Sequence, residues 1–136
     1  MASIPTKKID SYIKSIRPGF EEMLTRMVEI PTISNDPTRK PDIEKGADLA
    51  VEYLESIGAK AEKVTTKGNP VVYGQIMTGK DNPTIAIYNH LDIQPALEPG
   101  WKQEPFKLQK IDDRYTGRGA TDDKGPALSI LLAARF

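Results

Sequence analysis

The feature that most constrains the fold is a short apolar run at residues 85–88, which leads into the sequence Asn-His-Leu-Asp at 89–92. Four consecutive apolar residues, Ile-Ala-Ile-Tyr, are typical of a strand that is buried on both faces of a sheet. We therefore predict a central strand over residues 84–89. Its carboxyl end carries His90, the only histidine of the protein, and in α/β folds this end of the strands is where ligands usually bind.

The preceding segments predict helices and further strands. Residues 9–30 repeat apolar side chains at helical spacing, with Pro18-Gly19 as a kink or break, which indicates one amphipathic helix or two abutting ones. Residues 43–57 carry a second helical pattern, and Gly58 stands where a left-handed C-terminal cap belongs. Shorter strand-like runs, bounded by turn-forming residues, occupy 61–64, 71–77 and 106–111.

The order of these elements favours an α/β fold, and we predict a three-layer sandwich with a mixed sheet. Residues 106–111 alternate and turn at Asp112-Asp113 into a hairpin. Residues 124–136 read as an apolar helix that stops at Phe136 without a glycine, a proline or a polar exit. We expect that the chain is the front part of something longer, or that it pairs with another chain.

The bulk composition is that of an ordinary globular domain. The 136 residues contain 19 basic and 19 acidic side chains and no basic block, so we expect neither nucleic acid nor a membrane as a partner. Because there is no cysteine, disulfides, thiolate zinc sites and cysteine nucleophiles are excluded. The start lacks the apolar run of a signal peptide, and no apolar segment has membrane length, so we expect a cytoplasmic protein.

The first candidate site pair is His90 and Asp92, which lie two residues apart on a predicted extended segment, so their side chains point the same way. A lone histidine is more often structural than a metal ligand. Histidines that bind metals, however, usually donate their other ring nitrogen to a carboxylate, and Asp92 is placed to accept that hydrogen bond. The alternative is that Asp92 caps the turn that ends in Pro95.

The second candidate is the glycine-bounded acidic turn at residues 117–125, Gly-Arg-Gly-Ala-Thr-Asp-Asp-Lys-Gly. The adjacent carboxylates of Asp122 and Asp123 can coordinate a hard or borderline cation. Alternatively, they satisfy the free N–H groups and the dipole of the following helix. The turn is not a phosphate loop, because Lys124 precedes the closing glycine and no serine or threonine follows it.

Residues 89–95, 100–106 and 117–125 together resemble the zinc-dependent aminoacylase, carboxypeptidase and dipeptidase family. Trp101, Pro105-Phe106 and the Asp-Asp-Lys-Gly sequence at 122–125 resemble its dipeptidase branch in particular. The family cleaves amide bonds with a water that two zinc ions activate, and cobalt or manganese are further candidates for the metal.

The resemblance implies a role for each candidate residue. His90 would bind one metal ion, Asp122 would bridge two, and Asp92 would be the catalytic aspartate that orients His90. The substrate would be a small peptide or an N-acyl amino acid, and the complete protein would be a candidate homodimer, since relatives commonly dimerise.

The resemblance also implies groups that the sequence does not contain. A proton-transfer glutamate, another acidic ligand and a second histidine should come well after Asp122. We therefore expect residues 1–136 to be the amino-terminal part of a metallohydrolase catalytic domain that binds metal weakly and hydrolyses nothing alone. The alternatives are a non-catalytic α/β module or degenerate pseudoenzyme, and an N-acyl amino acid deacylase or desuccinylase.

Overall fold

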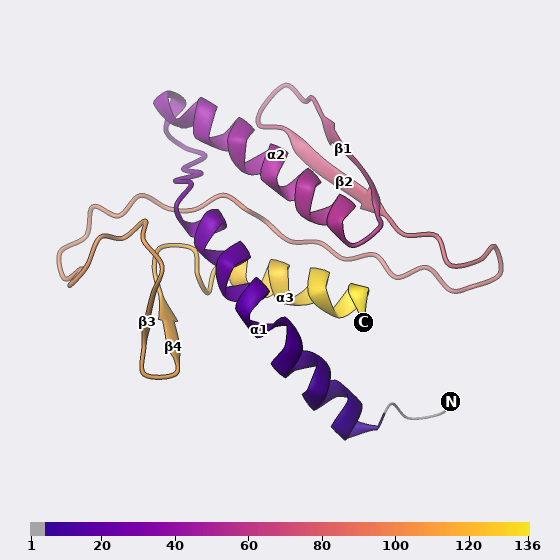
Figure 1. Ribbon diagram of the computed structural model, residues 1–136. Helices are drawn as coiled ribbons and strands as arrows, with labels where there is room; N and C mark the ends of the chain where they lie inside the picture. Colours follow the sequence, from indigo (N-terminus) through magenta and orange to yellow (C-terminus); the bar gives the residue numbers. More distant parts are fainter. Residues whose placement is uncertain (1–4) are drawn as a thin grey trace.

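The computed structural model describes residues 5–136 as helices packed on one another, with two small antiparallel sheets beside them (Figure 1). The elements in chain order are α1 (Thr6–Val28), the 3-10 helix η1 (Pro37–Arg39), α2 (Lys40–Ser56), β1 (Lys60–Val64), β2 (Val71–Gln75), β3 (Gln109–Ile111), β4 (Arg114–Thr116) and α3 (Lys124–Arg135). Among residues 5–136, none of the helices combines the length and the apolarity that a bilayer crossing requires.

Both amino-terminal helices follow from local sequence. α1 continues through Pro18, so the predicted kink does not divide it into two helices. α2 ends at Ser56, and Gly58 follows its C-cap residue in the predicted left-handed conformation, with a φ of 87° that glycine adopts without strain. The N–H groups of Gly58 and Ala59 donate to the carbonyls of Glu55 and Leu54 at 2.9 and 3.1 Å, which satisfies the end of the helix. The chain then reverses into the β1–β2 hairpin, which packs on α2 (Figure 1).

The core lies where α1, α2 and α3 meet. Leu24 and Val28 of α1 and Leu128 of α3 are almost fully buried there. Tyr53 of α2 joins them, and its hydroxyl donates to the carbonyl oxygen of Met23 at 3.1 Å. Apolar faces of three helices are thus removed from water together, which is the main stabilising contribution in a domain of this kind.

The predicted central strand is wrong. Residues 84–89 run through a long irregular connection between β2 and β3 and belong to no strand (Figure 1). Ile85, Ile87 and Tyr88 are exposed, the last to 87%. An apolar run is buried as a strand only when neighbouring strands pair with it, and the described part of the chain places none beside it.

The α/β class is confirmed, but residues 5–136 do not form a mixed sheet or three layers. Their strands make two separate two-stranded sheets, β1–β2 and β3–β4, both antiparallel. The β3–β4 hairpin turns at Asp112-Asp113, as predicted. Parallel pairing among the described residues is limited to one isolated bridge, between Ile33 and Ile93.

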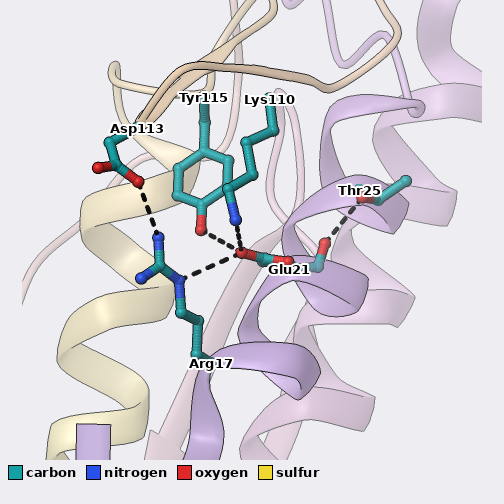
Figure 2. A network of polar contacts seen from close by, with 6 residues as sticks. All are labelled: Arg17, Glu21, Thr25, Lys110, Asp113 and Tyr115. Carbon is teal, nitrogen blue, oxygen red and sulfur yellow. Dashed lines mark hydrogen bonds and ion pairs between the residues drawn. The ribbon is translucent and has the colours of Figure 1, made fainter. Parts of the chain in front are cut away.

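A polar network holds the β3–β4 hairpin against α1. Figure 2 shows donors from three directions converging on one carboxylate oxygen of Glu21. The Tyr115 hydroxyl lies 2.7 Å from it, Lys110 Nζ 3.0 Å and Arg17 Nε 3.3 Å. The hydrogen bond from Tyr115 and then that from Lys110 are the main causes that lower the pKa of Glu21 to about 2.

The network predicts a specific acid sensitivity. The folded pKa of Glu21 is depressed, so its stabilising effect is fully present above the ordinary glutamate pKa of 4.5 and is lost as the pH falls toward about 2. Glu21→Gln should therefore lower the urea midpoint of unfolding at pH 7, and the gap to the wild type should close between pH 5 and pH 2. The exposed neighbour Glu22 provides the control, Glu22→Gln. A gap that is equally wide at pH 2 and pH 7 would contradict this account.

Candidate metal centre

Backbone pairing between two segments far apart in the sequence fixes the position of His90. Residues 31–34, after α1, lie beside residues 91–93, where Ile33 and Ile93 form the isolated bridge. The Ile93 N–H donates to the carbonyl oxygen of Thr32 at 3.0 Å, and the Thr32 hydroxyl donates to that of Leu91 at 2.5 Å. Thr32, Ile33 and Ile93 are all buried. The segment that carries His90 is thus anchored although no sheet holds it.

The acidic turn packs directly against this segment because Gly119 has no side chain. Gly119 has a φ of 83°, and a Cβ built on it would lie 2.6 Å from Cγ2 of Ile93. Gly125 is equally constrained, since its Cβ would lie 2.2 Å from the carbonyl oxygen of Ala120. Gly119 and Gly125 are therefore needed because the backbone at each position lies too close to a neighbouring residue for a side chain to fit.

A buried lysine ties the same turn to the end of α1. Lys124 is 1% exposed, and its Nζ donates to the carbonyl oxygens of Met27 and Ile30, each at 2.8 Å. Burial lowers the pKa of Lys124 to about 7. In the sequence, Lys124 was relevant only to the question of a phosphate loop. No sequence pattern indicates that it is buried and bonds to the end of α1.

The three predicted site residues come together. His90 lies between two carboxylates: its Nε2 is 3.0 Å from Oδ1 of Asp122, and its Nδ1 is 3.2 Å from Oδ1 of Asp92. Nδ1 is also 3.1 Å from the backbone oxygen of Asp92. Burial lowers the pKa of His90, but the hydrogen bonds and charges of Asp92 and Asp122 outweigh it and raise the pKa above its ordinary value. All three side chains are partly or largely open to solvent.

Asp123 has a different partner from Asp122. Its Oδ2 accepts a hydrogen bond of 2.9 Å from Nδ2 of Asn89, so the two adjacent carboxylates contact two adjacent residues of the other segment. The peptide bond between Asp122 and Asp123 is cis. Asp123 occupies the N-cap position of α3 without a capping hydrogen bond from its side chain, so the helix-cap interpretation fails for Asp123.

Ser34 is a site residue that the sequence patterns did not indicate. Its hydroxyl donates to Oδ2 of Asp92 at 2.5 Å. Ser34 lies between the two predicted helices, residues 9–30 and 43–57, in a segment that carries no helical or strand pattern. Its proximity to Asp92 depends on the pairing of segments 58 residues apart, for which no local pattern exists.

The donor set fits part of a zinc site. An imidazole nitrogen and a carboxylate oxygen are ligands that zinc takes, and they face each other in His90 and Asp122. Because Nδ1 is turned toward Asp92, Nε2 is the ring nitrogen available for a metal. Zinc prefers about four ligands. Residues 5–136 contain no group of three or more His, Cys, Asp or Glu side chains that could hold an ion.

Comparisons with known proteins show the family of the chain. Residues 86–135 match the family model described as Peptidase family M20/M25/M40. The chain is 38% identical to the Cys-Gly metallodipeptidase dug1 of Schizosaccharomyces pombe, over 93% of this chain and 29% of that protein. It superposes on the dipeptidase Dug1p of Saccharomyces cerevisiae with a TM-score of 0.83 at 32% identity, over 91% of this chain and 29% of the other. The chain belongs to this peptidase family.

Further relatives extend the match within the M20 family. The Beta-Ala-His dipeptidase of Rattus norvegicus is 29% identical over 93% of this chain and 29% of its own length. The crystal structure of human carnosine dipeptidase 1 superposes with a TM-score of 0.85 at 28% identity, over 94% of this chain and 30% of the other. The chain thus spans about three-tenths of the length of the relatives that it matches.

The contact between Gly119 and Ile93 predicts a large cost for a single methyl group. Gly119→Ala should destabilise the chain by about 2–5 kcal/mol, because a positive φ costs roughly 1–2 kcal/mol and overpacking roughly 1–3. Urea unfolding measures the change. Gly19→Ala is the matched control, since no atom lies within 4 Å of its Cβ in α1, and it should stabilise by about 0.5–1 kcal/mol. If Gly119→Ala were as stable as Gly19→Ala, the turn would relax around the added methyl group and the prediction would be wrong.

Proposed function

We propose that the complete protein is a dipeptidase that hydrolyses the amide bond of small dipeptides with a metal-activated water, and that residues 1–136 are the amino-terminal part of its catalytic domain. The observation that carries the proposal is the approach of His90 Nε2 to Asp122 Oδ1, 3.0 Å apart, with Nδ1 turned to Asp92. Its support is a match over more than nine-tenths of the chain to a protein named as a metallodipeptidase.

Each residue of the chain has a distinct task in this proposal. His90 would offer Nε2 to one ion, and Asp122 would bridge two with its two oxygens. Asp92 would keep the proton on Nδ1, which leaves the lone pair on Nε2 free. Two zinc ions held there would polarise the scissile carbonyl and lower the pKa of a bound water.

The names of the relatives favour dipeptides over N-acyl amino acids as the substrate class. The yeast proteins are named Cys-Gly metallodipeptidases and the mammalian ones Beta-Ala-His dipeptidases. The contacts of His90 with both Asp92 and Asp122 argue against a degenerate module, which would have no need of this arrangement. The remaining metal ligands and the proton-transfer glutamate belong, in this proposal, to the rest of the complete protein.

The proposal predicts that residues 1–136 alone hydrolyse no dipeptide. Loss of the general base alone typically costs a factor of about 10² to 10⁴. An incomplete ligand set adds to this. Purified chain should be assayed with zinc, manganese and cobalt against Cys-Gly and β-Ala-His, beside its His90→Ala variant to detect a contaminating peptidase. Turnover of about one per second or more, absent from the variant, would contradict the prediction.

In the complete protein, substitutions of His90, Asp92 and Asp122 should differ in their effects on the amount of bound metal and on the rate of hydrolysis. His90→Ala should lower bound metal, whereas Asp92→Asn should spare metal and reduce turnover by about 10- to 100-fold. Asp122→Ala should remove both ions, because a bridging ligand serves both. Metal analysis and calorimetric titration beside kinetics test this.

Asp123→Ala is the matched control for Asp122→Ala, since Asp123 contacts Asn89 and not His90. It should keep both ions and lose only some stability. One tight site that survives without Asp122, or two sites lost only without Asp123, would show that the bridging role is assigned to the wrong residue.

A further inference from the structure

The carboxylate of Asp92 has a different partner on each oxygen. Oδ1 faces Nδ1 of His90 at 3.2 Å, and Oδ2 accepts the hydroxyl proton of Ser34 at 2.5 Å. A carboxylate that is nearly half exposed can rotate unless both oxygens are engaged. The hydrogen bond from Ser34 therefore fixes the plane in which Asp92 presents Oδ1 to the imidazole.

The backbone places Ser34 where it can do this. Two features join its segment to that of Asp92: the parallel bridge between Ile33 and Ile93, which includes the hydrogen bond from Ile93 N–H to Thr32, and the hydrogen bond from the Thr32 hydroxyl to Leu91. These links flank the Ser34–Asp92 pair on the buried side. The hydroxyl is therefore carried by an anchored backbone, and the contact does not depend on a freely moving loop.

We propose that Ser34 is a positioning residue of the metal centre, which acts through Asp92 on the orientation of His90. The inference rests on the proposed function for its catalytic consequence. The order of contacts is Ser34 to Asp92, Asp92 to His90, and His90 to Asp122. Hydrogen-bonding partners outside the ligand set commonly change metal affinity or activity by about 10- to 100-fold.

The first test uses the complete, metal-loaded protein. Ser34→Ala should lower kcat about tenfold, while metal content and KM stay close to those of the wild type. Ser34→Thr keeps a hydroxyl and should restore most of kcat. Thr38→Ala is the matched control, because it removes a similar exposed hydroxyl–carboxylate bond, that of Thr38 to Asp36 at 2.7 Å, and should leave kcat unchanged. A Ser34→Ala enzyme with the wild-type kcat overturns the proposal.

A double variant tests whether Ser34 acts through Asp92. In the background of Asp92→Ala, the further change Ser34→Ala should have no effect on the remaining rate, because the acceptor is gone. If the two losses multiply instead, Ser34 acts by another route and the proposal is wrong.

The second test needs no activity, so it separates this inference from the proposed function. His90 is the only histidine, so ¹⁵N-histidine labelling of the chain gives the signals of one imidazole. At a pH where the ring is neutral, the wild type and Ser34→Thr should show mainly the Nδ1–H tautomer, and Ser34→Ala should show a clear loss of that preference. Identical spectra for all three overturn the inference. A wild-type complete protein that cleaves no dipeptide, with the tautomer shift present, would refute only the proposed function.

Discussion

One buried ammonium group, that of Lys124, sets the relation between the helices and the site. The last carbonyls of a helix have no partner within it, and cations are favourable at that end. Nζ of Lys124 supplies a further donor to the carbonyl oxygens of Met27, in the last turn of α1, and of Ile30, two residues beyond the helix. A buried charge costs several kcal/mol unless it is compensated. The two carbonyls and the negative charge of Asp92 offset this cost in part, while desolvation still lowers the pKa of Lys124 to about 7.

The position of the acidic turn follows from this anchor. Lys124 is the first residue of α3, so its side chain fixes the start of α3 at the carboxyl end of α1. The turn that leads into α3 must then pass over Ile93, which Gly119 makes possible. Asp122 comes to lie opposite His90 as a consequence. The geometry of the centre thus depends on helix ends and tight turns, and it does not require the sheet that the sequence predicts.

The sequence predicted the features that local physics determines. The helices over residues 9–30, 43–57 and 124–136 repeat apolar residues at helical spacing, and each is present with small changes at its ends. The strand over 84–89 failed because burial of an apolar run depends on distant partners. The roles of Ser34 and Lys124 could not be predicted for the same reason, since both depend on contacts between segments that are far apart in the chain.

The contact between His90 and Asp92 was predicted correctly from a premise that the structure does not support. The premise was that side chains two apart on a strand point the same way, and residues 84–92 form no strand. The two residues meet because Nδ1 lies within hydrogen-bonding distance of the backbone oxygen of Asp92 as well as its carboxylate, at 3.1 and 3.2 Å. The backbone oxygen of Asp92, only two residues from His90, lies close to the imidazole ring although the segment is irregular. Short polar links of this kind therefore hold the imidazole in place, and the Nε2 atom faces Asp122 in the absence of a sheet.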